Sequence, residues 1–158
     1  MNPSSAVIRI DLDDLSGPEI RALLQAHLRN MHELSPPCSV HALDIDKLRQ
    51  PDVTFWTAWG GNELLGCGAL RELSPKHGEV KSMRTSDAHR GQGVARAVLH
   101  RIIEEARTRS YDRLSLETGR MKAFEPAQKL YESFGFTRCA PFGNYVDDPH
   151  SVFMTRSL

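Results

Sequence analysis

The stretch Arg90–Ala95, with the sequence RGQGVA, has the residue types and spacing that bind a phosphate group. Glycines allow the backbone to turn so that its N–H groups point inward and approach a ligand closely. Such N–H groups bind phosphate best at the start of a helix, where they lack intrahelical partners and lie at the positive end of the dipole. On its own, a glycine-rich match of this length also fits an ordinary turn before a helix.

The segments on either side predict the elements that would position this turn. Glu79–Thr85 is typical of a strand, and a polar connection at 86–89 leads from it to the glycines. After the turn, apolar residues recur at the spacing of a helix with one face on a core. They are Val94, Val98, Leu99, Ile102, Ile103 and Ala106. The turn is therefore expected between a strand and a helix N-terminus.

Two common phosphate-binding motifs do not fit this stretch. A P-loop requires Gly-Lys-Ser or Gly-Lys-Thr after the loop, and no such triplet follows here. A dinucleotide fingerprint requires a third glycine, but Arg96 follows Gly91 and Gly93 at that place. Asp112 lies directly before the next predicted strand, whereas a ribose-binding acid should lie at the end of a strand.

A second motif, Ala127–Phe136 with the sequence AQKLYESFGF, follows after one further predicted strand. Together with Arg90-x-x-Gly93-x-Ala95, it resembles the GNAT superfamily of N-acetyltransferases. That family carries R/Q-x-x-G-x-G/A at its acetyl-CoA site and A-x-x-L-Y-x-x-x-G-F later in the chain. The resemblance covers the chain from Val53 to its end.

The C-terminal region narrows this resemblance. Its pattern, Phe142-Gly143-x-Tyr145-x-x-Asp148-Pro149-x-Ser151-x-Phe153-Met154, occurs together with Phe55-Trp56-x-Ala58-Trp59. Both patterns are similar to a bacterial branch of small acetyltransferases labelled YsnE-like. The resemblance to this branch does not identify the acceptor.

The resemblance implies an acetyl-CoA-dependent N-acetyltransferase that uses no metal. It would move an acetyl group to a primary amine of a small molecule or amino acid, by direct transfer in a ternary complex. A protein or peptide acceptor is the alternative within the enzymes, and the neutral charge and compact chain favour the small molecule. A non-catalytic acyl-CoA-binding regulatory module is the alternative of another class, which would bind acetyl-CoA without turnover.

The resemblance also implies which residues contact acetyl-CoA. The turn would bind the pyrophosphate, and the end of the preceding strand would pair with the pantetheine arm. Phe124 stands seven residues before Tyr131, where many family members carry asparagine. Either an apolar contact from Phe124 replaces the polar one, or the loop 118–122 supplies the polar contact. The expected cofactor-binding residues are Met83, Arg84, Thr85, Arg90, Gly91, Gln92, Gly93, Val94, Ala95, Arg96 and Phe124.

Tyr131 matches the tyrosine of the second family motif and is the expected general acid for the leaving thiolate. A tyrosine has an ordinary pKa of about 10, so it is protonated at neutral pH and can donate. A tyrosine packed on the helix face, with its hydroxyl on the cofactor, is the structural alternative. Tyr145, Trp56 and Arg84 are candidates for lining the acceptor pocket.

Glu79 is the expected general base, because a carboxylate at the start of the central strand can take the proton of an ammonium acceptor, directly or through water. Strand alternation predicts that it points to the same side as Lys81 and Met83. An exposed acid at the end of a strand is an equally simple interpretation. The reserve candidates for this role are Glu72, Glu33 and Glu117.

Composition limits the class of protein. The chain has 158 residues, which predicts one domain over residues 1–158. It carries 20 Lys plus Arg and 20 Asp plus Glu, so no basic field for a nucleic acid is expected. The sequence contains no apolar run long enough to predict a membrane span, and its first residues do not have the pattern of a signal peptide. Its three widely spaced cysteines are typical of a protein in a reducing cytoplasm. A homodimer, formed through sheet edges, is the expectation for this family.

The order of predicted elements gives the fold class. Strands and early helices precede a strand-helix-strand-helix-strand succession, which favours an α+β fold, or mixed α/β sandwich. The resemblance implies a mostly antiparallel sheet of six to seven strands, flanked by about four helices. Strands are predicted at 6–12, 53–59, 64–73, 79–85, 113–118, 136–139 and 151–156, and helices from 18 to before Pro36, at 43–50, 94–106 and 124–133.

Overall fold

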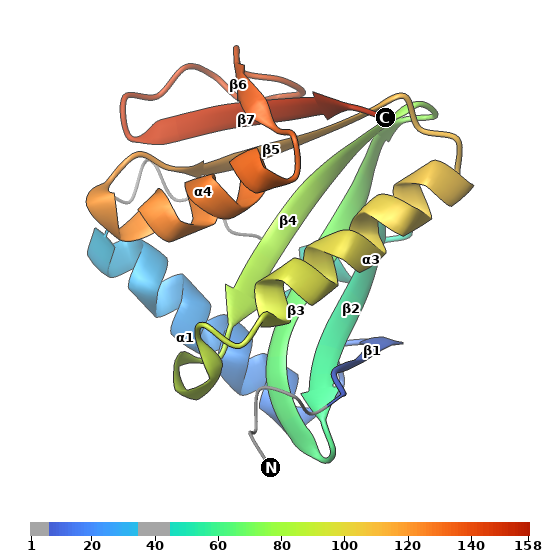
Figure 1. The fold of residues 1–158 in the computed structure, drawn as a ribbon, viewed down its shortest axis with the longest axis vertical. Coiled ribbons are helices and arrows are strands. Elements are labelled where there is room, and N and C mark those ends of the chain that lie inside the picture. Colours follow the sequence, from blue (N-terminus) through green and yellow to red (C-terminus); the bar gives the residue numbers. More distant parts are fainter. Residues whose placement is uncertain (1–6, 35–44) are drawn as a thin grey trace.

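The computed structural model describes the backbone of residues 7–34 and 45–158, and the side chains of residues 7–26 and 45–158. In this part of the chain, seven strands form one sheet in the order β1-β2-β3-β4-β5-β7-β6, with four α-helices packed on it (Figure 1). The elements are β1 (Arg9–Leu12), α1 (Pro18–Leu34), α2 (Ile45–Leu48), β2 (Val53–Gly60), β3 (Glu63–Ser74), β4 (His77–Thr85), η3 (Asp87–His89), α3 (Val94–Thr108), β5 (Arg113–Gly119), η4 (Lys122–Phe124), α4 (Glu125–Ser133), β6 (Thr137–Cys139) and β7 (Ser151–Ser157).

The predicted α+β class is confirmed, and so is the sheet of seven mostly antiparallel strands with four helices. The predicted first strand is shorter, because β1 begins at Arg9, and Ala6 lies outside the described residues. The predicted helix at 43–50 is described only as the single turn of α2, and its first two residues also lie outside the described part.

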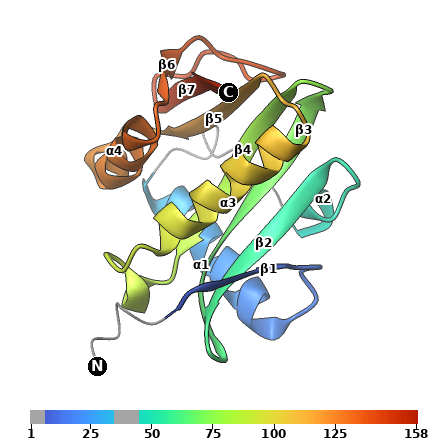
Figure 2. The same ribbon diagram turned by 45° about the vertical axis from the view of Figure 1, so that its right-hand side comes forward.

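Two separate apolar cores lie on the two faces of the sheet. α3 lies across one face, and α1 lies on the other (Figure 2). The face under α3 and α4 carries the larger core, to which α3 contributes its predicted apolar stripe. Every residue of that stripe is buried: Val94, Val98, Leu99, Ile102, Ile103 and Ala106. The smaller core joins α1 and α2 to the opposite face through Ile20 and Leu48.

Glycines of β3 allow α3 to pack closely on the sheet. A Cβ atom at Gly66 would lie 2.8 Å from Cγ1 of Val94, and one at Gly68 would lie 2.6 Å from Cγ1 of Val98. Both distances are shorter than any ordinary contact of a Cβ atom, so a larger residue at either place would push the helix away. The glycines therefore set where the N-terminal half of α3 lies.

β4 and β5 form the parallel pair of the described sheet, and they pair along only part of their length. The pairing runs from His77 with Arg113 to Val80 with Leu116, and then stops. Beyond it, the strands diverge, as Figure 1 shows. We call the space between 81–85 of β4 and 117–119 of β5 the wedge. Because the strands are parallel, it opens toward the N-termini of the helices that follow them, α3 and α4.

A β-bulge at Ser82 changes the direction of the side chains on the β4 side of the wedge. Lys81 pairs with Ala69 and Arg84 pairs with Cys67, so Ser82 and Met83 together lie opposite one residue of β3. Ser82 has a φ of 55°. The bulge turns Met83 into the core under α3. The prediction that Met83 shares the side of Glu79 is therefore wrong, because it assumed unbroken alternation.

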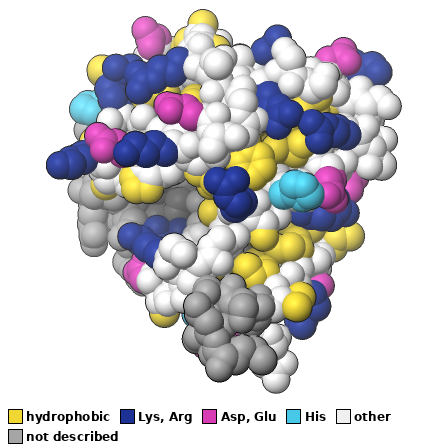
Figure 3. Space-filling model, in the orientation of Figure 1, with side chains coloured by type: hydrophobic (Ala, Val, Ile, Leu, Met, Phe, Trp, Pro, Cys, Tyr) yellow, Lys and Arg dark blue, Asp and Glu magenta, His cyan; other side chains and the backbone are white. Residues whose placement is uncertain are grey.

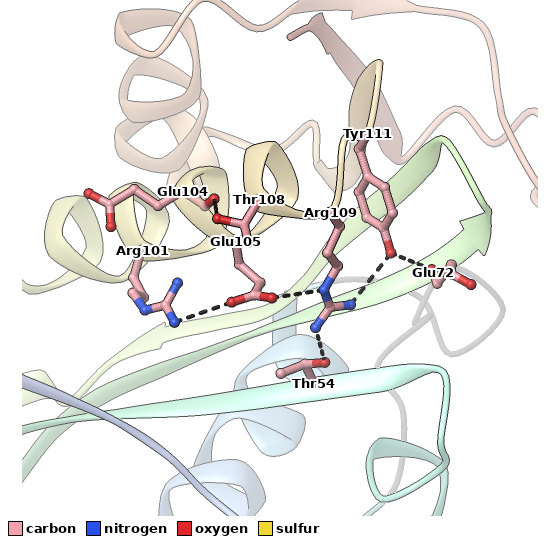
Figure 4. Close-up of polar contacts among 8 residues, drawn as sticks. All are labelled: Thr54, Glu72, Arg101, Glu104, Glu105, Thr108, Arg109 and Tyr111. Atoms are coloured by element: carbon pink, nitrogen blue, oxygen red, sulfur yellow. Dashed lines mark hydrogen bonds and ion pairs between the residues drawn. The ribbon is translucent and has the colours of Figure 1, made fainter.

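The C-terminal end of α3 is tied to the sheet by a chain of polar contacts (Figure 4). Arg109 donates hydrogen bonds to Glu105 at 2.9 Å and to Thr54 on β2 at 2.7 Å. The hydroxyl of Tyr111 donates to Glu72 on β3 at 2.7 Å. These contacts lie at the paired end of β4 and β5, away from the wedge, and they fix α3 at the end opposite the glycine-rich turn.

Candidate active site

The glycine-rich turn lies before α3, as the sequence predicts. Gly91 and Gly93 have φ angles of 77° and 83°, and Gly93 is the N-cap residue of the helix. A Cβ atom built at either glycine would meet nothing within 4 Å, so the backbone faces open space. The first turn of α3 contains no acidic residue. The free N–H groups and helix dipole at this position can therefore hold a phosphate.

Three arginines surround the turn. Arg90 and Arg84 form ion pairs with the same oxygen of Asp87, at 2.7 Å and 3.2 Å. Burial lowers the pKa of the Arg84 guanidinium below its ordinary value. Arg96 reaches from α3 to α4, where it donates to Ser133 at 3.3 Å and stacks over a phenylalanine ring. Figure 3 shows Lys and Arg side chains around α4 and along α3, and a hollow between α4 and the start of α3.

The β5 side of the wedge ends at Gly119. A Cβ atom there would lie 2.2 Å from the ring of Phe124, so the ring rests directly on the glycine backbone. Gln128, which is buried on α4, donates a hydrogen bond to the Gly119 carbonyl at 2.7 Å. This contact fixes the start of α4 against β5. Phe124, the last residue of η4, therefore lies at the β5 edge of the wedge, whereas Met83 and Thr85 belong to β4.

Tyr131 lies on α4 with its side chain buried in the larger core. Its ring meets that of Phe136 edge to face, with centroids 5.9 Å apart. Burial raises the pKa of Tyr131 well above its ordinary value, and the negative charge of Glu117 raises it further. The hydroxyl has no hydrogen-bond partner among the described residues. It therefore stays protonated at neutral pH and is able to donate.

Glu79 is not exposed at the end of a strand. Its side chain is 1% exposed, and its Oε2 atom lies 3.0 Å from the Lys81 ammonium. The Tyr145 hydroxyl donates to the same oxygen at 2.7 Å, and the ammonium donates to that hydroxyl at 2.8 Å. Oε1 of Glu79 is buried and has no hydrogen-bond partner among the described residues. We call Glu79, Lys81 and Tyr145 the buried triad.

Sequence reasoning did not find the buried triad. It placed Glu79 and Lys81 on one side of a strand, and their opposite charges at that spacing were the available signal. Tyr145 is 66 residues from Glu79, and the path of its loop does not follow from local patterns. Burial raises the pKa of Tyr145 above its ordinary value, and the neighbouring charge of Glu79 adds to the effect.

The other candidates lie at different places. Glu117 is half-buried on the β5 side of the wedge, where it accepts a hydrogen bond from Ser151 at 2.7 Å. Glu72 lies with Tyr111 at the far end of the sheet. Glu33 lies near the end of α1, and its side chain is outside the described residues. Trp56, a candidate for the acceptor pocket, is buried in the core under α3.

Two properties of the described residues bear on the class of protein. They contain no group of three His, Cys, Asp or Glu side chains that could hold a metal ion. None of their helices has the length and apolar character needed to cross a bilayer.

The glycine-rich turn before α3, the wedge between two parallel strands and the tyrosine on α4 have the arrangement that the two sequence motifs predict for an acetyltransferase. Residues 20–136 match the Acetyltransferase (GNAT) family, and the chain therefore belongs to this family of N-acetyltransferases. It is 59% identical over 151 residues to the N-acetyltransferase YsnE of Bacillus subtilis strain 168, covering 96% of this chain and 100% of that protein. It is 39% identical over 131 residues to the IAA acetyltransferase of Azospirillum brasilense, covering 82% and 84%.

Solved structures support the fold. A Klebsiella pneumoniae protein described as an acyl-CoA N-acyltransferase matches with a TM-score of 0.78 and 28% identity, over 98% of this chain and 99% of that one. A GNAT acetyltransferase from Elizabethkingia anophelis with acetyl-CoA bound matches with a TM-score of 0.71 and 20% identity, over 96% and 98%. The chain thus has the GNAT fold, as the sequence motifs implied.

Proposed function

We propose that this acetyltransferase moves an acetyl group from acetyl-CoA to a primary amine of a small molecule or amino acid, by direct transfer while both substrates are bound. The observation that carries the proposal is the separation of β4 from β5 after Val80 and Leu116. Past these residues, β4 and β5 are not paired with each other in the described part of the chain, and this edge of β4 lies between the glycine-rich turn and Tyr131. Glu79 and Lys81 of the buried triad lie on the neighbouring part of β4.

The residues around the wedge fit acetyl-CoA, which supplies the acetyl group as a thioester. The N–H groups of 91–95 would bind its pyrophosphate, assisted by Arg90 and Arg96. The edge of 83–85 that faces away from β3 can pair with an extended, amide-containing arm as a further strand would. The N–H of Met83 is the proposed donor to the developing oxyanion. Phe124 would supply an apolar contact on the other side.

Tyr131 is the proposed general acid. Its hydroxyl is protonated, because burial and the charge of Glu117 both raise its pKa. A donor of this kind can transfer a proton to the sulfur of the leaving group as the carbon–sulfur bond breaks. General acid catalysis contributes about 10²- to 10⁴-fold to the rate, so its removal should lower kcat by that order.

Glu79 is the proposed general base. Oε1 has no hydrogen-bond partner among the described residues, and leaving a buried charged oxygen unpaired is costly. One water molecule, or the amine of the acceptor, has the size and donors to satisfy it. Either could deliver the ammonium proton to the carboxylate before the amine attacks.

Three observations support a small acceptor. The formal charge is zero, so no charged field for a polymer is evident. The loop that carries Tyr145 packs Phe142 against Phe153, with centroids 5.9 Å apart, and so covers part of the face of the sheet next to Glu79. A relative that is 39% identical is named IAA acetyltransferase. A protein or peptide acceptor remains the alternative within the family.

The experiment measures free-thiol release from acetyl-CoA with a panel of amines, amino acids and short peptides. It compares the wild type, Tyr131→Phe, Glu79→Gln and the control Tyr111→Phe, which removes a tyrosine hydroxyl at the far end of the sheet. We expect amine-dependent release that falls strongly in the first two variants and persists in the control. The best amine in the panel would define the acceptor class.

Three other outcomes would contradict parts of this proposal. Faster release with peptides than with any small amine would favour the protein acceptor. Firm acetyl-CoA binding without release for any acceptor would contradict the enzyme role on this panel and favour a non-catalytic acyl-CoA-binding module. Full activity of Tyr131→Phe would remove that residue from the chemical step.

We further propose a homodimer in the cytoplasm. The outer edges of β1 and β6 have no strand partner in the described part of the chain, which leaves two places where sheets of two subunits can join. Cys67 and Cys139 are free thiols, which is consistent with a reducing compartment. Light scattering after size-exclusion chromatography would test the dimer, and a monomeric mass would contradict it.

A further inference from the structure

We propose that Lys81 and Tyr145 are positioning residues for the Glu79 carboxylate, which together hold Oε2 and leave Oε1 to take the proton of the acceptor. The inference rests on the proposed role of Glu79 as the base. It assigns a function to two residues outside the motifs of the glycine-rich turn and α4.

The contacts of the buried triad are one-sided. Lys81 and Tyr145 both donate to Oε2 of Glu79, at 3.0 Å and 2.7 Å, and nothing among the described residues donates to Oε1. A carboxylate can accept on both oxygens, and a purely structural ion pair is stable in a dry interior only when its remaining lone pairs are satisfied. In this arrangement Oε2 accepts two hydrogen bonds and Oε1 accepts none from the described residues. Such a carboxylate is suited to accept a further hydrogen bond, or a proton, on Oε1.

The hydroxyl of Tyr145 is held where it is by the packing of its own ring. The ring meets Phe142 with centroids 5.2 Å apart and Phe153 with centroids 5.6 Å apart. The Lys81 ammonium lies 5.4 Å from the centroid of the same ring. Phe153 on β7 and Phe142 in the loop hold the ring in place. The hydroxyl of Tyr145 can therefore fix the rotation of the Glu79 carboxylate on β4.

Charged and titratable groups on several elements lie near Glu79. Within the described residues, the groups that face it are Lys81 on its own strand, Arg71 opposite it on β3, His77 two residues earlier and Tyr145 from the loop. The charge of Glu117 reaches Tyr145 from β5 and opposes them. Burial lowers the pKa of His77, and the charge of Arg113 lowers it further, so this imidazole is largely neutral at neutral pH. Lys81 is therefore the nearest positive charge in contact with the carboxylate.

The test measures kcat/KM against pH in Tyr145→Phe and Lys81→Met. The acid limb is the part of the profile in which kcat/KM falls as the pH is lowered. Loss of a hydrogen bond or of a positive charge disfavours the ionised form of the carboxyl group, so the acid limb should move to higher pH. We expect a displacement of about one pH unit for Tyr145→Phe, and a larger one for Lys81→Met. The KM for acetyl-CoA should stay within a factor of two or so, because neither side chain is part of the proposed cofactor contacts.

Tyr111→Phe is the matched control. Its hydroxyl also donates to a glutamate at 2.7 Å, but that glutamate is Glu72, at the far end of the sheet. This variant should leave the acid limb where it is in the wild type. Lys81→Arg keeps a positive charge and should restore most of the profile lost in Lys81→Met, and it covers the case in which Lys81→Met does not fold.

A second measurement does not depend on turnover. In the protein without substrate, a carbon-13 NMR titration of the Glu79 carboxyl, assigned with Glu79→Gln, should show the same displacements as the acid limbs. His77→Gln, which keeps a hydrogen-bonding group opposite Ser115, separates the titration of this imidazole from that of the carboxylate.

The outcomes separate the two proposals. If Glu79→Gln is fully active, the role of Glu79 as base fails, and the positioning proposal falls with it. If Glu79→Gln is inactive while Tyr145→Phe and Lys81→Met keep the wild-type acid limb and titration, the positioning proposal alone is overturned. An acid limb that disappears in His77→Gln would also overturn it, because the limb would then belong to the imidazole.

Discussion

The thiol of Cys67 donates a hydrogen bond to the backbone carbonyl of Ser82, with the sulfur 3.3 Å from the oxygen. Ser82 is the left-handed residue of the β4 bulge, a conformation that costs a non-glycine residue about 1–3 kcal/mol. The bulge turns Met83 under α3 and shapes the β4 side of the wedge. A buried thiol on β3 therefore contacts the strained backbone that gives the candidate site its form.

This environment predicts an unreactive thiol. Burial raises the pKa of Cys67 to about 12, against the opposing charge of Arg84, so about one molecule in ten thousand is a thiolate at pH 8. Cys139 is half-buried, and burial raises its pKa above the ordinary value. We expect iodoacetamide at pH 8 to modify Cys139 well before Cys67, as read by peptide mass spectrometry. Equal rates in native protein would contradict the burial of Cys67, and urea-unfolded protein, in which both should react, is the control.

Much of the site follows from local sequence patterns. The apolar stripe of α3 could be predicted because a period near 3.6 is a property of the helix itself. Gly91 and Gly93 could be placed before it because only glycine adopts their positive φ angles without strain. Gly135 has a φ of 88° and ends α4, as its position in the second motif predicts. Each of these features depends on residues close in sequence.

The buried triad and the bulge could not be predicted in the same way. A bulge at Ser82 changes one residue of register and reverses every side chain after it, but a serine carries no signal for it. The contact of Tyr145 with Glu79 depends on where its loop crosses the sheet, which the packing of Phe142 on Phe153 determines. Both features result from tertiary packing.

Gly93→Ala should weaken acetyl-CoA binding through the turn. An alanine at a φ of 83° is strained by about 1 kcal/mol, and relief of that strain would rotate the N–H groups at the start of α3. Gly61→Ala is the matched control, because Gly61 has a φ of 60°, with nothing within 4 Å of an added Cβ, in the turn between β2 and β3. We expect both variants to lose similar stability and only Gly93→Ala to raise the Kd for acetyl-CoA, measured by calorimetry. A Kd raised equally in both would contradict a specific role of the turn.

Gly68→Ala should destabilise the fold and disturb the wedge together. The new Cβ would lie 2.6 Å from Sδ of Met83 and 2.6 Å from Cγ1 of Val98, so the bulge, the helix or both must move. Overpacking of this kind costs about 1–3 kcal/mol of unfolding free energy, which urea titration would measure. Gly17→Ala, whose nearest atom would be 3.5 Å away, is the control. A stable Gly68→Ala variant with wild-type acetyl-CoA affinity would contradict the close packing of α3 on β3.

Arg109→Met should destabilise the protein at the far end of α3. The guanidinium contacts Glu105, Thr54 and Tyr111 and is only 29% exposed, so its loss leaves partly buried partners unsatisfied (Figure 4). We expect a loss of about 1–2 kcal/mol at pH 7. Arg107→Met, two residues earlier on the exposed side of α3, is the control and should change little.

The pH dependence of that loss identifies the partner responsible. A hydrogen bond from Arg109 lowers the pKa of Glu105 below its ordinary value of 4.5, so the folded state binds this proton more weakly than the unfolded state. The corresponding stability is present above pH 4.5 and is lost as the pH falls through the pKa of the folded state. Urea titrations from pH 7 downward should therefore show the difference between Arg109→Met and wild type shrinking below pH 4.5, while the part due to Thr54 and Tyr111 remains. A difference that stays constant down to pH 3.5 would show that Glu105 contributes nothing to it.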